Sequence, residues 1–146
     1  MNKEFFRKLL PQTDLCGIYH LPSGSLKPLE EASGLLDYAR FNIDFLESGE
    51  IQSVLDTLGQ ALGFPKWYGA NLDALNDCLT DFSWHEASGY VFIISGCNAL
   101  YEQSNAFDKI NAVFSHAIEE WRDQNIPFWV FYTIRTNSLP PLPIQA

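Results

Sequence analysis

Hydrophobic and polar residues follow two kinds of pattern along the chain, and each predicts a different element. Two short runs rich in β-branched and aromatic residues, Tyr90 to Ile94 and Ile126 to Ile134, are apolar on both faces. This pattern is typical of strands buried in a parallel sheet. Arg40 to Leu46 alternates between polar and apolar residues and predicts a half-buried or edge strand, and Cys16 to Leu21 is a weaker strand candidate.

The stretches between these strands have the spacing of amphipathic helices. Gly49 to Leu62 carries apolar side chains three and four positions apart, and Gly63 and Pro65 follow as a stop signal. Ser104 to Asp123 predicts a longer helix with one apolar face, and Leu29 to Tyr38 predicts another helix between the first two strands. Strands that alternate with helices predict an α/β fold in which right-handed crossovers join parallel strands.

The composition indicates one globular domain over residues 1–146. Of the 146 residues, 47% are hydrophobic and 18% are charged, with a formal net charge of −9. Because nucleic acids and anionic membranes attract cationic surfaces, we expect neither as the direct partner. The three cysteines lack the spacing of a disulfide framework or a zinc site, and no apolar run has the length of a signal peptide or a membrane span. We therefore expect a cytoplasmic protein that is monomeric when free.

The negative charge is concentrated in the middle of the chain. From Phe41 to Asp108 there is one base, Lys66, against ten acidic residues, so this stretch accounts for the whole net charge. Such a concentration favours a cationic partner, but acidic side chains also serve solubility alone. The charge by itself leaves both interpretations open.

The segment from Phe64 to Trp84 is the most informative part of the sequence. Pro65 and Gly69 bracket a turn with two large aromatic residues, and Asn71 then predicts the N-cap of a short helix. On a helical projection one face is apolar, consisting of Leu72, Leu75, Cys78, Leu79 and Phe82. The roughly opposite face carries Asp73, Asp77 and Asp81. Carboxylates at this spacing repel one another by about 0.2 to 0.5 kcal/mol a pair, which indicates either an acidic binding face or a merely solvated one.

The stretch from Pro65 to Thr80 reads Pro-Lys-Trp-Tyr-Gly-Ala-Asn-Leu-Asp-Ala-Leu-Asn-Asp-Cys-Leu-Thr and resembles the signature of the barstar family. Barstar is an intracellular inhibitor of an extracellular ribonuclease. The expected order of elements also agrees with that family from about residue 40 to 134, which implies a small parallel sheet of three core strands packed with helices. Residues 1–39 have no counterpart there, and we expect from them a fourth strand and a helix. We expect residues 135–146, which include Pro140 and Pro143, to form a flexible tail.

The resemblance implies an inhibitory surface without a cofactor, a metal or catalysis. It implies that Trp67 packs on the nuclease, that Asp73 meets its Arg and Lys side chains, and that Asp77 enters its catalytic cleft in place of an RNA phosphate. The other partner-binding residues predicted in this way are Tyr68, Gly69, Asn71, Asn76, Thr80, Asp81 and Phe82. The chain departs from the family at Asn76, Asp81 and Phe82, and has His116 where some members place an acid.

Two other functions are compatible with the residues. A regulatory interaction module would bind a basic protein that is not a nuclease. A hydrolase would use Asp73 and Asp77 to hold Mg²⁺, but no candidate base, nucleophile or phosphate-binding loop accompanies them. Trp84 and Phe82 are candidates for either core or contact, and His116 is predicted as a surface or half-buried histidine rather than a contact.

Overall fold

A computed structural model describes residues 1–134, 136 and 138–143 of the chain. The elements along the chain are α1 (Lys3–Leu9), a 3-10 helix η1 (Thr13–Leu15), β1 (Ile18–His20), α2 (Leu26–Leu35), β2 (Ala39–Asp44), α3 (Ile51–Ala61), α4 (Leu72–Asp81), β3 (Tyr90–Ser95), α5 (Asn98–Glu102), α6 (Ser104–Asp123) and β4 (Phe128–Tyr132). Every predicted strand range overlaps a strand, and the predicted α/β fold is confirmed.

The four strands form one parallel sheet in the order β1-β4-β3-β2. The two central strands, β3 and β4, are the two runs that are apolar on both faces, and every residue of β4 is buried. β2 lies at one edge of the sheet, and its partly or fully buried positions alternate with exposed ones, as its sequence predicts. β1, which comes from the first 39 residues, forms the other edge of the sheet and pairs with β4.

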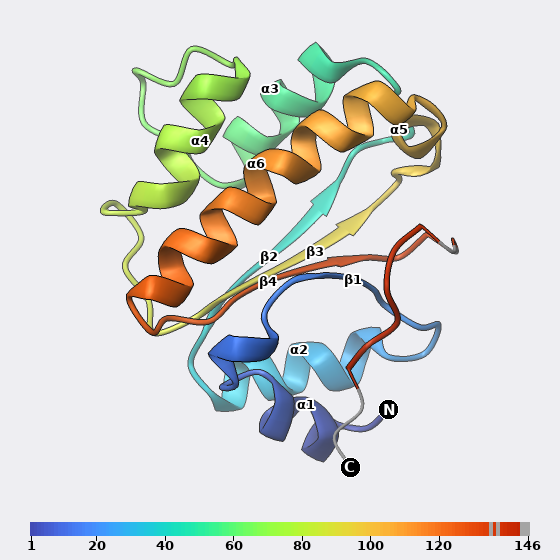
Figure 1. The fold of residues 1–146 in the computed structure, drawn as a ribbon, viewed down its shortest axis with the longest axis vertical. Coiled ribbons are helices and arrows are strands. Elements are labelled where there is room, and N and C mark those ends of the chain that lie inside the picture. Colours follow the sequence, from blue (N-terminus) through green and yellow to red (C-terminus); the bar gives the residue numbers. More distant parts are fainter. Residues whose placement is uncertain (135, 137, 144–146) are drawn as a thin grey trace.

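The direction of the crossovers accounts for the two helical layers. The connection from β1 to β2 runs across the whole sheet in one direction, whereas the connections from β2 to β3 and from β3 to β4 step back in the other. Because parallel crossovers are right-handed, these two directions place their helices on opposite faces. Figure 1 shows α1 and α2 below the sheet, and α3, α4 and α6 above it.

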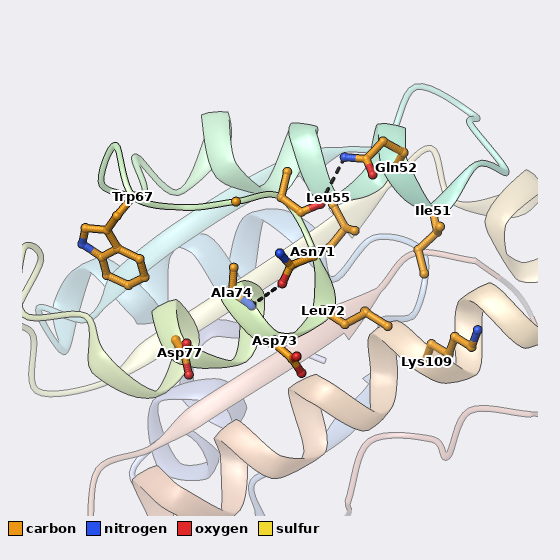
Figure 2. A pocket seen from close by; sticks show the side chains of 12 residues that line it. Ile51, Gln52, Leu55, Trp67, Asn71, Leu72, Asp73, Ala74, Asp77 and Lys109 are labelled. Carbon is orange, nitrogen blue, oxygen red and sulfur yellow. Dashed lines mark hydrogen bonds between the residues drawn. The ribbon is translucent and has the colours of Figure 1, made fainter.

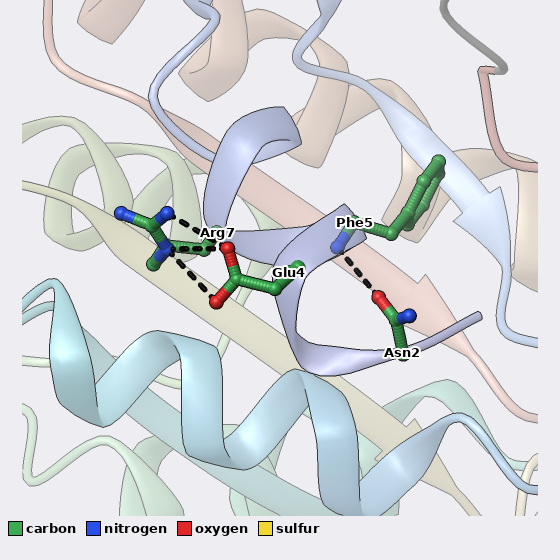
Figure 3. Close-up of polar contacts among 4 residues, drawn as sticks. All are labelled: Asn2, Glu4, Phe5 and Arg7. Atoms are coloured by element: carbon green, nitrogen blue, oxygen red, sulfur yellow. Dashed lines mark hydrogen bonds and ion pairs between the residues drawn. The ribbon is translucent and has the colours of Figure 1, made fainter.

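Helix α1 is an element that the hydrophobic pattern did not predict. It has only seven residues, of which Phe6 and Leu9 are buried, so its periodic signal is short. Polar contacts define it instead: the Phe5 N–H donates to Oδ1 of the N-cap Asn2 at 2.9 Å, and Arg7 pairs with Glu4 at 2.7 Å (Figure 3).

Helix α2 is shifted from the predicted range of Leu29 to Tyr38. It begins three residues earlier, at Leu26, because Pro28 lies in the first turn, where a missing N–H costs no intrahelical hydrogen bond. It ends at Leu35, and Asp37 then takes a left-handed φ of 57° that the helix cannot contain.

The predicted flexible tail is corrected over its described residues. Leu139 and Leu142 are buried, and the His20 N–H donates to the Pro140 carbonyl at 3.0 Å. Residues 138–143 therefore pack on the domain, because the tail supplies apolar side chains next to β1 and a backbone acceptor for it. The rest of that prediction at residues 135, 137 and 144–146 lies outside the described residues. Within the described part of the chain, no helix has the length and apolar character needed to cross a membrane.

Candidate functional site

Helix α4 begins at Leu72, directly after the predicted N-cap Asn71. Asn71 has an extended backbone, and its Oδ1 accepts a hydrogen bond from the Ala74 N–H at 2.8 Å, which confirms the predicted cap. The helix ends at Phe82, whose left-handed φ of 49° turns the chain away. Both ends of α4 are thus fixed by local backbone geometry, so the side chains between them have defined directions.

The inner face of α4 packs into the core. Leu75, Cys78 and Leu79 are fully buried, as the projection predicts. Phe82 is also fully buried, with its ring stacked on Tyr90 at 4.8 Å, so the prediction that Phe82 contacts a partner is corrected. The left-handed turn directs this side chain inward, next to the end of the apolar face. Trp84 is half-buried and its Nε1 donates to the Leu62 carbonyl at 3.4 Å.

The outer face of α4 carries Asp73, Asp77 and Asp81, all exposed, and we call these three residues the acidic ridge. Among the residues that the structure describes, none of the three lies within the 4.0 Å of an ion pair to a basic nitrogen. Asp81 accepts a hydrogen bond from the Ser83 hydroxyl at 3.2 Å. The ridge therefore presents carboxylates whose charge is not neutralised by any base in the described part of the chain.

The turn before α4 presents one aromatic ring and buries the other. Trp67 is 57% exposed, and among the large hydrophobic residues that the structure describes only Leu46 and Leu35 are more exposed. Tyr68 is half-buried: its ring lies edge-to-face on Phe64 at 4.8 Å, and its hydroxyl donates to the Leu55 carbonyl at 2.8 Å. Burial raises the pKa of the Tyr68 phenol well above its ordinary value. Of the two predicted aromatic contacts, Trp67 is thus the one whose ring faces solvent.

The remaining predicted site residues lie along the same surface. Gly69 and Asn71 are exposed, whereas Asn76 and Thr80 are partly buried. The Thr80 hydroxyl donates to the Asn76 carbonyl at 2.8 Å, within the helix. His116 of α6 is exposed, and its Nδ1 lies 2.7 Å from Asn76 Oδ1, so α6 adjoins this surface.

A groove of about 760 Å³ opens beside the acidic ridge, between α3, α4 and α6. Figure 2 shows Trp67, Asp73 and Asp77 along one part of it and Lys109 of α6 at the opposite end from Trp67. Its lining is Ile51, Gln52, Leu55, Trp67, Gly69, Ala70, Asn71, Leu72, Asp73, Ala74, Asp77 and Lys109. Sequence reasoning missed Lys109, because only the packing of α6 on α4 brings it to this surface.

The site has the chemistry of a binding surface. Burial, together with the charges of Asp77 and Asp81, raises the pKa of the Cys78 thiol to about 11, so this thiol stays protonated at neutral pH and is a poor nucleophile. Within the described ranges, no group of three or more His, Cys, Asp or Glu side chains is arranged to hold a metal ion. The arrangement offers unpaired carboxylates and an exposed indole, which suit cationic side chains.

Comparisons with solved structures find similar folds in larger proteins. A structure described as Drosophila ORC bound to AT-rich DNA and Cdc6 is 15% identical, with a TM-score of 0.55 over 94% of this chain and 48% of that one. The Aeropyrum pernix ORC2 protein, in ADPNP-ADP complexes, is 12% identical with a TM-score of 0.48, over 94% of this chain and 46% of that one. The chain thus spans about half the length of these proteins. At 15% identity, the likeness to the Drosophila structure indicates a shared fold alone.

Comparison of the sequence with protein families is more specific. No curated protein matches the chain at a significant level. The family model described as "Barstar (barnase inhibitor)" matches residues 38–133, which include β2, β3, β4, the aromatic turn and the acidic ridge. Because this match covers well over half of the chain, the protein belongs to the barstar family.

Proposed function

We propose that this protein is an inhibitor that binds a cationic ribonuclease or nuclease toxin and blocks its active site with the acidic ridge and Trp67. The observation that carries the proposal is the set of unpaired carboxylates on α4, beside an exposed indole, in a chain of the barstar family. We assign no catalytic activity and no cofactor to it.

The physical basis of the inhibition is mimicry of the substrate's charge. A ribonuclease active site concentrates basic groups to bind the phosphodiester, and a carboxylate held on a rigid helix offers the same groups a negative partner. Arg binds a carboxylate through two parallel charge-assisted hydrogen bonds. We assign the central position to Asp77, which lies midway along the ridge, and a flanking position to Asp73. Occupation of the cleft then excludes RNA.

Long-range charge supports the same assignment. The net charge of −9 resides in the stretch that contains the ridge. Complementary charge on two proteins raises the rate of encounter, and close pairs at the centre of the interface slow dissociation. We also propose that the protein acts in the cytoplasm, since its three cysteines are free and buried, as suits a reducing compartment.

The test is an inhibition assay with a matched variant. RNA cleavage by purified barnase, and by a panel of other cationic ribonucleases that includes any nuclease encoded beside this gene, is measured as the protein is titrated in. We expect stoichiometric loss of activity with at least one enzyme, and much weaker inhibition by Asp77→Ala. Full cleavage by every enzyme at micromolar excess of inhibitor would contradict the proposal. Recovery of only non-nuclease partners from the host cell would favour a regulatory interaction module instead.

A further inference from the structure

The groove beside the acidic ridge carries charges of both signs. Asp73 and Asp77 line it from α4, and Lys109 lines it from α6. We infer that the groove receives a loop of the partner, an inference that rests on the proposed function. This loop places a basic side chain next to the ridge and an acidic side chain next to Lys109. The partner is therefore not uniformly basic where it meets this protein.

The groove separates its two charges in space. Figure 2 shows the Lys109 side chain at the end opposite Trp67, directed away from Asp73. The side chain of Leu72 lies between Asp73 and Lys109, and that of Ile51 lies at the same end as Lys109. A loop that spans the groove thus meets carboxylates, then apolar side chains, then an ammonium group.

Lys109 is free to bind a partner. Its side chain is exposed, and no ion pair within 4.0 Å joins it to Asp73, Asp77 or any other carboxylate of the described residues. An ammonium group on a flexible stem pairs readily with a carboxylate that comes within reach. Because neither Asp73 nor Asp77 pairs with Lys109, and no other described carboxylate does, its charge is available at the groove.

A lysine in this position has a cost if the partner is basic throughout. Two ammonium or guanidinium groups that face each other in an interface repel, and the repulsion increases as water is excluded. A partner carboxylate opposite Lys109 turns this repulsion into attraction. The same arrangement disfavours nucleases that have a basic cleft but no acidic group beside it, so Lys109 acts as a specificity determinant.

A uniformly basic partner and a partner with a carboxylate opposite Lys109 predict opposite changes in affinity when Lys109 is replaced by glutamate. If the partner is uniformly basic, Lys109→Glu removes a repulsive charge and tightens binding. If the partner places a carboxylate there, the same substitution weakens binding, by about tenfold for one lost pair and more with the new repulsion. Lys27→Glu is the matched control, because it changes the net charge equally at an exposed position on α2, on the other face of the sheet.

The experiment measures the dissociation constant for the ribonuclease that the protein inhibits most strongly in the panel, at about 0.15 M salt. We expect Lys109→Glu to weaken binding tenfold or more, Lys109→Gln to weaken it less, and Lys27→Glu to leave it unchanged or slightly tighter. Thermal unfolding of each variant checks that the fold is retained, and Lys109→Gln keeps the test valid if Lys109→Glu does not fold.

The outcomes separate this inference from the proposed function. If Asp77→Ala weakens binding but Lys109→Glu tightens it or matches Lys27→Glu, the partner is uniformly basic at the groove and the inference is overturned while the proposed function stands. If no ribonuclease binds, or if Asp77→Ala has no effect on the one that does, the proposed function fails and the inference fails with it.

Discussion

The Tyr68 hydroxyl donates a 2.8 Å hydrogen bond to the Leu55 carbonyl, which ties the turn that presents Trp67 to α3. The same ring lies close to Gly59, also on α3: a Cβ atom added there would come within 2.6 Å of the Tyr68 ring. Contacts with α3 therefore hold the turn that carries Trp67 in place, and Gly59 leaves room for the Tyr68 ring.

This packing predicts that Gly59→Ala affects binding rather than helix formation. Alanine favours a helix over glycine by about 0.5 to 1 kcal/mol, but its methyl group must displace Tyr68 and with it Trp67. We expect affinity for the ribonuclease to fall about tenfold. Gly34→Ala on α2 is the control, because its Cβ would meet nothing within 4 Å. If Gly59→Ala and Gly34→Ala bound the ribonuclease with equal affinity in a titration, the contact of Tyr68 with α3 would not be what positions the turn.

The sequence predicted the regular part of the fold because periodicity reports burial directly. Tyr90 to Ile94 in β3 and Phe128 to Tyr132 in β4 are apolar throughout, and α6 spans the predicted range of Ser104 to Asp123 without change. The acidic ridge and the Asn71 cap were also predictable, since both depend on local spacing.

Features that depend on long-range packing were not predictable in the same way. Phe82 falls on the apolar face of the projection and also in the family's contact region, and only the structure, through its stacking on Tyr90, decides between core and contact. Lys109 reaches the groove because α6 crosses α4, which no local pattern encodes. The tail buries Leu139 and Leu142, two leucines among prolines whose burial depends on the neighbouring surface, and Pro140 accepts a hydrogen bond from β1.

The buried face of α4 predicts a loss of stability without a change in the binding surface. Leu75 is fully buried in the hydrophobic core. We expect Leu75→Ala to lower the free energy of unfolding by about 2 to 5 kcal/mol, because it removes apolar contacts and leaves a cavity. Asp73→Ala, on the exposed side of the same helix, is expected to change it by less than about 0.5 kcal/mol. Urea unfolding of both variants gives the comparison, and similar losses would contradict the assignment of the two faces.

The buried thiols predict lower stability at alkaline pH. Burial raises the pKa of Cys78 to about 11 from an ordinary value near 9, and it raises those of Cys16 and Cys97 similarly. The unfolded chain therefore loses these protons at a lower pH than the folded chain. Their stabilising effect is complete below about pH 9 and is lost as the pH rises towards 11.

Urea unfolding at pH 8, 9 and 10 measures this effect of the thiols. We expect the free energy of unfolding to fall above pH 9, and to fall less steeply in Cys78→Ala, which has one thiol fewer to titrate. The half-buried Tyr68 and the buried Tyr132 contribute in the same direction in the variant and in the parent protein, since burial raises their pKa values as well. Equal slopes for Cys78→Ala and the parent protein would show that Cys78 does not contribute.

The acidic ridge predicts an order of effects on binding. Asp77 is central to the ridge and Asp73 lies one turn before it, beside the exposed N-terminal end of α4. We expect Asp77→Ala to weaken binding most, by about 2 kcal/mol or more, as for a charge at the centre of an interface, and Asp73→Ala to weaken it less. Both variants should keep the parent's thermal stability, because both side chains are exposed. Since salt screens long-range attraction more than close pairs, association of the parent should slow with added salt. A ridge that served solubility alone would leave the affinity of both variants unchanged.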